Sequence, residues 1–250
     1  MSDSTKATVI GAAPEGASDP ASAALAVRKM FSSIAPRYDL LNHLLSFNVD
    51  RLWWRKTARS FASILKRQDA RVLDLCCGTG DMTFALFREA GESAKILGVD
   101  FSHAMLLRAT EKSAEKSLRW VEADAIHLPF PDQQFDLITA AFGFRNLGDY
   151  DAGLQEMVRM LRPGGECGIL DFGEPRGLIG KLYRVYFKRI LPAVGTVVSG
   201  VKGPYVYLPA SVERFPSPEE MLGRMRSAGF REASWTPYTF GIAGLYRGKK

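Results

Sequence analysis

Acidic side chains flank a glycine turn in the stretch of this chain that is best suited to chemistry. Asp74 lies inside an apolar run at 71–75, and a turn with Gly78 and Gly80 follows at once. A carboxylate inside a buried strand is unfavourable unless it meets hydrogen-bond donors or a cation. Gly78 allows the backbone to turn sharply, and Gly80 leaves no Cβ between the main chain and whatever lies against it. The pattern predicts a ligand-binding turn between a buried strand and a helix, although a lone Gly-x-Gly is also found in ordinary strand-to-helix turns.

A second acidic residue stands where it would reach a ribose. The strand-like run 95–99 ends in Asp100, roughly 20 residues beyond the turn, which is the spacing at which an acidic side chain meets ribose hydroxyls. A dinucleotide site would need a third glycine early in the following helix, and this chain has none there. Asp74 and Asp81 would also repel a pyrophosphate. A ligand with a ribose, an ammonium group and no phosphate fits better, so we expect S-adenosylmethionine as the cofactor.

An alternation of strands and helices must position these residues. Apolar, β-branched runs predict strands, and amphipathic stretches between them predict helices. The predicted strands are 71–75, 95–99, 118–122, 134–140, 166–171, 231–236 and 240–246, and the predicted helices between them include 82–90, 103–115 and 150–161. This rhythm indicates an α/β, Rossmann-like, doubly wound sheet of seven mostly parallel strands with helices on both faces. The last strand is expected to be antiparallel, because the final two strands are close enough in sequence to form a hairpin.

Ligands bind beyond the carboxyl ends of the strands in such sheets, so the residues at those ends are the candidates for contact. Phe101 is placed to cover an adenine face, and Asp124 to accept a hydrogen bond from the adenine amino group. The alternative for Asp124 is a local role, capping the loop before Pro129.

Three segments lie outside the sheet pattern. Residues 1–21 are rich in small and polar residues and predict a disordered tail, and residues 22–250 form one domain. Within this domain, residues 22–67 are predicted to form a helical cap, with Asp50 as the N-cap of its second helix. The cap would lie over the cofactor and wall the substrate pocket, or simply pack on the domain. An insertion at 178–215 begins with a helix that presents Lys181, Arg184 and Lys188 on one face, which suits either a membrane surface or a solvated face.

Composition narrows the function classes. The chain has 250 residues, a formal net charge of +6 and a sequence pI near 9.3, but no Lys/Arg block of the kind that binds nucleic acid. Its three cysteines lack metal-ligand spacing, so we expect no metal and a reducing, cytoplasmic setting. No run approaches the ~18 uncharged apolar residues that span a bilayer.

Several stretches resemble a known family. They are Tyr38-Asp39-x-x-Asn42-x-x-x-Ser46, Asp74-x-x-x-Gly78-Thr79-Gly80-Asp81, Leu128-Pro129-Phe130, Phe142-Gly143-Phe144-Arg145-Asn146, Leu161-Arg162-Pro163-Gly164-Gly165, Tyr205-Val206-Tyr207-Leu208 and Gly241-Ile242-Ala243. The glycine turn resembles the nucleotide loop of class I methyltransferases, and the set together resembles one branch of them, the UbiE/MenG quinone C-methyltransferases. The first and fourth stretches together are the specific ones. The likeness runs from about Lys29 to the C-terminus.

The resemblance implies S-adenosylmethionine as cofactor and a polyprenylated quinol as methyl acceptor. Demethylmenaquinol is favoured, with the benzoquinol of ubiquinone biosynthesis as a further acceptor. Carried over by position, it implies cofactor contacts at Thr79, Asp100, Asp124 and Ala125. The chain departs from the family at three places: Ala141 stands where relatives have a serine that contacts the cofactor, Asp50 where they have histidine, and Asp171-x-Gly173 where they have Glu-x-Ser.

Methylation of a quinol ring needs a group that stabilises the developing phenolate. We expect Arg145 in this role, with Asn146, Tyr38 and Asp39 orienting the ring. The alternative for Arg145 is a surface ion pair with Asp149. Of the three histidines, only His43 is placed to reach a substrate.

Two other functions remain open from the sequence alone: methylation of a small soluble O or N nucleophile, and a non-catalytic protein that binds S-adenosylmethionine as a sensor. A homodimer and peripheral contact with the inner face of the cell membrane are further expectations.

Overall fold

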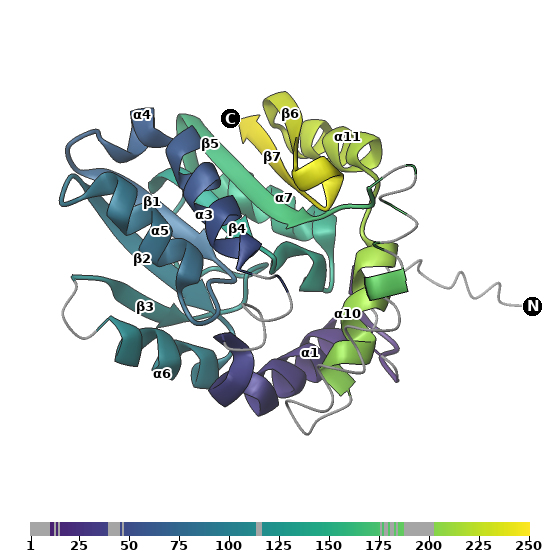
Figure 1. The fold of residues 1–250 in the computed structure, drawn as a ribbon. Coiled ribbons are helices and arrows are strands. Elements are labelled where there is room, and N and C mark those ends of the chain that lie inside the picture. The colour runs from purple at the N-terminus through teal and green to yellow at the C-terminus, as the bar shows by residue number, and fades with distance from the viewer. Residues whose placement is uncertain are drawn as a thin grey trace, which may run out of the picture.

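The computed structural model describes residues 11–12, 14, 16–39, 46, 48–113, 117–175, 177, 180, 183, 185–187 and 203–250. A seven-stranded sheet in the order β3-β2-β1-β4-β5-β7-β6 forms its centre (Figure 1). The strands are β1 (Ala70–Leu75), β2 (Ala94–Asp100), β3 (Arg119–Glu122), β4 (Phe135–Ala141), β5 (Leu161–Phe172), β6 (Arg231–Tyr238) and β7 (Ala243–Lys249). Only β7 runs antiparallel to its neighbours. The predicted Rossmann-like class and the antiparallel last strand are confirmed.

Helices cover both faces of the sheet. The helices are α1 (Pro20–Ile34), α3 (Val49–Ser60), α4 (Ala62–Leu65), α5 (Asp81–Ala90), α6 (His103–Lys112), α7 (Tyr150–Met160), α10 (Gly203–Arg214) and α11 (Pro218–Ala228), with short 3-10 turns η1 (Ala35–Arg37), η2 (Phe144–Asn146) and η4 (Thr239–Gly241). Successive residues of a strand point to opposite faces. Val72 of β1 therefore packs with Trp53 of α3 and Leu86 of α5, while Leu73 packs in the core that contains Leu154 of α7. This two-sided burial is why the central strands read as apolar runs rather than as alternating ones.

The second helix of the cap begins differently from the prediction. Asp50 is not its N-cap: that position is held by Asn48, in the left-handed conformation and without a side-chain cap hydrogen bond. Asp50 is buried in the first turn of α3 instead. The helix also stops at Ser60, and Phe61 separates it from the short α4.

The Leu161-Arg162-Pro163-Gly164-Gly165 stretch lies within β5. Phe135 pairs with Leu161 and Leu137 pairs with Glu166, so a bulge containing Pro163 interrupts the ladder. A bulge leaves its extra residues unpaired, which suits a proline with no N–H to donate.

The N-terminal segment is packed where the structure describes it. Ala12 is buried, and its N–H donates to the carbonyl of Leu147 at 2.7 Å. α1 then begins at Pro20, with Asp19 and Ser22 forming a capping box. The prediction of disorder for 1–21 is therefore wrong near Ala12, and residues 1–10 lie outside the described part of the chain.

The described part of the chain contains no helix long and apolar enough to cross a membrane. The basic residues of the helix predicted at 178–191, which are Lys181, Arg184 and Lys188, lie outside the described residues. Two of the described aromatic residues of that segment, Tyr183 and Phe187, stack on each other at 5.1 Å between ring centroids.

Candidate active site

One cavity of about 370 Å³ lies at the carboxyl ends of the central strands. Residues from β1, β2 and β4 and the loops after them form its floor, and α1, α3 and α10 contribute its walls. Figure 1 shows α1 and α10 next to each other on the side of the sheet where the strands end, and α3 across a face of the sheet beside α5. One end of the cavity is acidic and lies against the glycine turn, and the other end is aromatic. This is the place that the strand-end rule predicts for a ligand.

The glycine turn is fixed by left-handed backbone at Cys76, Gly78 and Gly80. A Cβ on Gly78 would meet nothing within 4 Å, so this residue presents bare backbone to the cavity that it lines. A Cβ on Gly80 would lie 2.7 Å from the indole of Trp120. Gly80 is therefore required by its φ of +89° and by the packing of Trp120, and it does not belong to the cavity lining.

Asp100 ties the end of β2 to this turn. Its Oδ2 accepts the N–H of Gly78 at 2.8 Å, and its Oδ1 accepts the N–H of Ser102 at 2.8 Å. Burial raises the pKa of Asp100 to about 6, and the two backbone hydrogen bonds oppose that rise. A carboxylate oxygen accepts more than one hydrogen bond, so Asp100 can still receive ribose hydroxyls in the cavity that it lines.

Asp74 finds its partners inside the protein. Its two carboxylate oxygens accept the hydroxyls of Thr83 at 2.5 Å and Thr139 at 2.8 Å. Burial raises the pKa of Asp74 to about 7, and the two hydroxyl hydrogen bonds lower it. A buried acid in this range shifts towards its charged form when a cation comes near, and Asp74 also lines the cavity.

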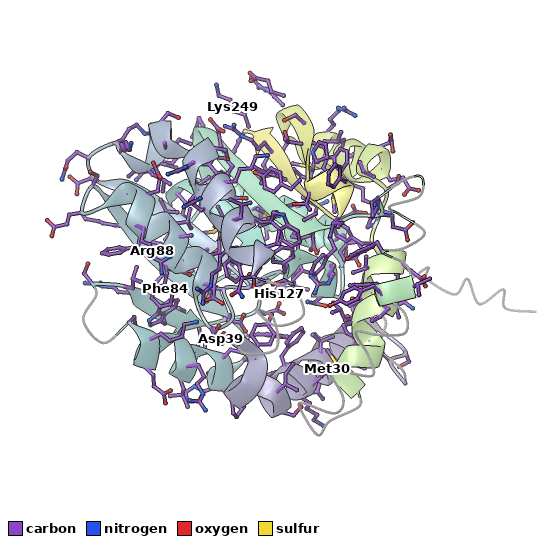
Figure 2. All side chains as sticks on the ribbon, viewed as in Figure 1. Met30, Asp39, Phe84, Arg88, His127 and Lys249 are labelled. Atoms are coloured by element: carbon purple, nitrogen blue, oxygen red, sulfur yellow. The ribbon has the colours of Figure 1, made fainter. Side chains whose placement is uncertain are left out.

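A lysine that the sequence analysis missed joins the cap to the glycine turn. Lys112, at the end of α6, contacts Asp39 and Asp81 at 2.8 Å each, and Thr79 at 3.3 Å. The Thr79 hydroxyl also donates to Asp39. Figure 2 labels Asp39 beside α6, at the end of the N-terminal helical segment. Asp39 does not belong to the cavity lining, so the structure places it on the cofactor turn rather than against a substrate ring.

The remaining predicted cofactor residues are in the lining. They are Phe101, Asp124, Ala125 and Ala141. Asp124 also accepts the N–H of Ile126 at 3.1 Å and forms a β-bridge with His127. The other oxygen, Oδ2, lies 3.5 Å from Nδ1 of His127. The two roles considered for Asp124 are compatible, because the carboxylate is half-exposed and each of its oxygens accepts more than one hydrogen bond.

Arg145 is buried rather than on the surface. Its guanidinium Nη1 contacts Asp171 at 2.8 Å and donates to the carbonyl of Phe142, and its carbon atom Cζ lies 5.1 Å from the centroid of the Phe172 ring. The alternative of a surface ion pair with Asp149 is wrong, since Asp149 caps α7 by accepting the N–H of Ala152. The side chain of Asp171 is therefore long enough to hold the arginine.

Three buried polar atoms in the described part of the chain have no hydrogen-bond partner: Nε of Arg145, Oδ1 of Asn146 and the hydroxyl of Tyr207. All three residues line the same cavity. Unsatisfied buried groups are rare in native proteins and call for an explanation such as a ligand. The sequence analysis identified the first two residues and missed Tyr207, although the Tyr205-Val206-Tyr207-Leu208 stretch was the available signal.

The predicted substrate residue Tyr38 also lines the cavity, and its ring meets Phe31 edge-on at 6.0 Å. His43, the histidine placed to reach a substrate, lies outside the described residues. His103 and His127 carry exposed side chains paired with Glu122 and Asp124.

The donor set at the acidic end fits S-adenosylmethionine. Carboxylates of Asp100 and Asp124 suit ribose hydroxyls and an amino group, Gly78 leaves the backbone open, and the acids favour a sulfonium over a phosphate. Among the described lining residues, Arg145 is the only basic one. The fold and this donor set define a class I, S-adenosylmethionine-dependent methyltransferase.

Comparisons with known proteins agree and narrow the class. The model of the ubiE/COQ5 methyltransferase family matches residues 19–250. A demethylmenaquinone methyltransferase from Deinococcus radiodurans is 49% identical over 228 residues, covering 90% of this chain and 92% of that protein. One from Thermus thermophilus is 48% identical, covering 88% of this chain and 100% of that protein. A ubiquinone/menaquinone biosynthesis C-methyltransferase UbiE from Geobacter sulfurreducens is 45% identical, covering 90% and 88%. This chain belongs to the ubiE/COQ5 methyltransferase family.

Solved structures show the fold more broadly. A S-adenosylmethionine-dependent methyltransferase from Aquifex aeolicus has a TM-score of 0.57 at 20% identity, covering 77% of this chain and 88% of that one. The [4+2]-cyclase SpnF has a TM-score of 0.68 at 17% identity, covering 97% and 99%. Because a protein titled as a cyclase shares the fold so fully, the fold alone does not define the reaction.

Proposed function

We propose that this protein transfers a methyl group from S-adenosylmethionine to a ring carbon of demethylmenaquinol, giving menaquinol. The observation that carries the proposal is the cavity with two unlike ends: an acidic nucleoside end at Asp100 and an aromatic end that holds three unpartnered polar atoms. The similarity to proteins named demethylmenaquinone methyltransferase supports the choice of acceptor. The benzoquinol of the ubiquinone pathway is a further acceptor in the same proposal, supported by the relative named for both pathways.

The acidic end would hold the cofactor. Asp100 would accept the ribose hydroxyls, Asp124 the adenine amino group, and Phe101 would cover an adenine face. When bound, S-adenosylmethionine supplies an electrophilic methyl group and a neutral thioether leaving group. Asp39, Thr79 and Lys112 hold the glycine turn and the cap together, and this contact would help to exclude water from the cofactor end. Positioning of reacting groups in this way contributes roughly 7–11 kcal/mol in favourable cases.

The aromatic end would hold the quinol ring. Trp53, Phe142 and Phe172 form a cluster with ring centroids 4.6–6.3 Å apart and line the cavity. Offset and edge-on aromatic contacts of this kind bind flat fused rings well. Tyr38 lines the same cavity and would contact the ring from the cap.

Arg145 would stabilise the oxyanion that develops as the quinol hydroxyl loses its proton. Asp171 and the Phe142 carbonyl both hold Nη1, which fixes the guanidinium plane and leaves Nε as a preorganised donor. The Tyr207 hydroxyl would donate to the same or the second ring oxygen, and Oδ1 of Asn146 would accept from a ring hydroxyl. In the reaction the quinol hydroxyl would pass its proton to water, and the ring carbon–methyl bond would form as the methyl–sulfur bond breaks. The methylated carbon would then lose its hydrogen as a proton while the ring oxygen takes a proton back, so that the product is a quinol and one proton is released overall.

The test is a direct assay of purified protein with a short-chain demethylmenaquinol, kept reduced, and S-adenosylmethionine labelled in its methyl group. We expect label in a quinone product with the mass of one added methyl group, and S-adenosylhomocysteine in equal amount. Soluble phenols and amines serve as competing acceptors. Label in those acceptors with none in the quinone would refute the proposal and favour the soluble-nucleophile alternative.

We also propose that the protein works in the cytoplasm at the inner face of the cell membrane, because its acceptor carries a polyprenyl chain. The predicted homodimer remains a prediction. Light scattering of the purified protein measures its mass and tests it.

A further inference from the structure

The outer face of α3 carries cations that have no acidic partner among the described residues. Arg51, Arg55 and Lys56 are exposed on one face of the helix, and none of them pairs with an acid in the described part of the chain. Arg59, one turn further on, lies 4.0 Å from Glu89 and marks the end of this face. The five exposed residues between Arg51 and Arg59 include no acid, so the face has an uncompensated positive charge.

Two of the most exposed large apolar side chains belong to the same region. Leu52 of α3 is 51% exposed and Phe240 of η4 is 76% exposed, the highest value among large apolar side chains of the described residues. η4 lies directly against α3: Nε1 of Trp53 donates to the Thr239 hydroxyl at 2.8 Å, and Nζ of Lys56 lies 4.1 Å from the centroid of the Tyr238 ring. We call Arg51, Leu52, Arg55, Lys56 and Phe240 the α3–η4 face.

The backbone at Phe240 is strained in a way that exposes its ring. Thr239 and Phe240 have φ of +44° and +57°, a region that residues with a Cβ avoid. Left-handed backbone at two successive non-glycine residues is unfavourable, and here it produces an aromatic ring in solvent instead of a buried one. Such an arrangement suits a contact that the isolated chain does not contain.

The α3–η4 face is the outside of the cavity's aromatic end. Val49 and Trp53 of α3 line the cavity, and so do Thr239 and Ile242 on either side of Phe240. The inner side of these two elements therefore meets the acceptor ring, while the outer side presents cations around two exposed apolar side chains.

We propose that the α3–η4 face docks on a bilayer that contains anionic lipids, so that the acceptor enters the cavity from the membrane without crossing water. This inference deepens the proposed function and rests on it for the identity of the acceptor. The chemistry is that of an interfacial protein: cations meet lipid phosphates while apolar side chains enter the boundary with the acyl chains. The surface of Glu174, an exposed acid close to this region in the loop after β5, would stay at the edge of the contact.

The experiment is sedimentation of the full chain with vesicles of phosphatidylcholine alone or mixed with phosphatidylglycerol. One variant, R51Q/R55Q/K56Q, removes the charges, and another, L52S/F240S, removes the apolar contacts. Each cation near an anionic surface contributes about five-fold in binding, so the first variant should bind mixed vesicles roughly 100-fold more weakly. The second should lose about ten-fold or more on both compositions.

Matched controls lie elsewhere on the surface. R88Q/R226Q/R231Q removes three exposed cations that are also without an acidic partner in the described residues, and L107S removes a leucine that is 52% exposed. Both controls should bind vesicles like the parent protein. Figure 2 labels Arg88 on α5, away from α10 and η4.

A second readout separates this inference from the proposed function. All variants should methylate a short-chain quinol in solution at the parent rate, and the two face variants alone should methylate a long-chain quinol in mixed vesicles slowly. Equal vesicle binding by parent and face variants, loss of binding in the controls, or binding of a DNA duplex in place of vesicles would overturn the docking face. Those outcomes would leave the quinol reaction standing, whereas absence of methylation in solution would remove the proposed function itself.

Discussion

The buried pair of Arg145 and Asp171 allows stability and catalysis to be separated by one set of variants. Arg145→Met keeps most of the side-chain volume and removes the charge. Asp171 would then retain only two backbone donors, the N–H groups of Arg145 at 3.2 Å and Phe172 at 2.9 Å. Removing one partner of a buried ion pair costs about 3–5 kcal/mol.

This loss of unfolding free energy should lower the melting temperature by a measurable amount. Domains of this size lose roughly 2–4 °C per kcal/mol, so we expect Arg145→Met to melt roughly 6–20 °C lower than the parent protein. The double variant R145M/D171N leaves no isolated charge in the core and should recover much of that temperature. Turnover should not recover, because both variants lack the donor at Nε that faces the cavity. Loss of one such donor typically lowers kcat by about 10²–10³-fold.

The assay combines calorimetric melting, titration with S-adenosylhomocysteine and turnover of a short-chain demethylmenaquinol. Cofactor affinity should be unchanged in the double variant, which shows that the acidic end is intact. Arg145→Lys keeps the charge but lacks the planar guanidinium group, so its turnover should fall between that of the parent protein and that of Arg145→Met. If R145M/D171N regained both melting temperature and turnover, Arg145 would be a structural residue only and the proposed chemistry of the aromatic end would be wrong.

Three further predictions concern single residues. Burial on folding raises the pKa of Asp74 from its ordinary 3.8 to about 7, so the parent protein loses stability as pH rises through that window, at about 1.36 kcal/mol per pH unit. Asp74→Asn should flatten this part of the pH profile in denaturant titrations, and an unchanged profile would contradict the assignment. Lys112→Met leaves Asp39 and Asp81 without their shared cation and should weaken cofactor binding about ten-fold in calorimetry, with Arg108→Met on the same helix as a control that binds normally. Tyr207→Phe should keep the melting temperature, because the hydroxyl has no hydrogen-bond partner among the described residues, and should lower kcat about ten-fold or more; equal kcat would exclude the hydroxyl from the reaction.

The fold was readable from the sequence because its core is two-sided. Central strands such as β1 and β4 are buried on both faces and read as apolar runs, and the helices between them are amphipathic. The backbone conformation at irregular residues, where the chain changes direction, could not be predicted from the sequence. Asn48 replaces Asp50 at the start of α3 because a left-handed residue turns the chain there, and no cap pattern records that.

The candidate site likewise contains some residues that were predicted from the sequence and others that were not. Asp100, Asp124 and Arg145 were predicted because strand ends meet at one edge of a parallel sheet, which makes their proximity a consequence of topology. Lys112 and Tyr207 were missed because each sits on a helix and reaches the site through tertiary packing. Asp39 was assigned to the ring from its motif, and only the packing of the cap on α6 shows that it contacts Thr79 and Lys112.

The order of the strands in the sheet also sets the order of the site residues along its edge. Asp100 follows β2, Gly78 follows β1, Arg145 follows β4, and Asp171 ends β5, and these strands are neighbours in that sequence. Two inter-strand spacings of about 4.8 Å separate β2 from β4, the strand that precedes Arg145, or roughly 10 Å along the edge of the sheet. A ribose at Asp100 and an oxyanion at Arg145, as proposed, would therefore be kept apart by the sheet itself, with the open backbone of Gly78 between them. A substitution that shifts the register of β1 would change the distance between the methyl donor and the ring without touching either contact, so the rigid sheet positions the reaction as directly as the side chains do.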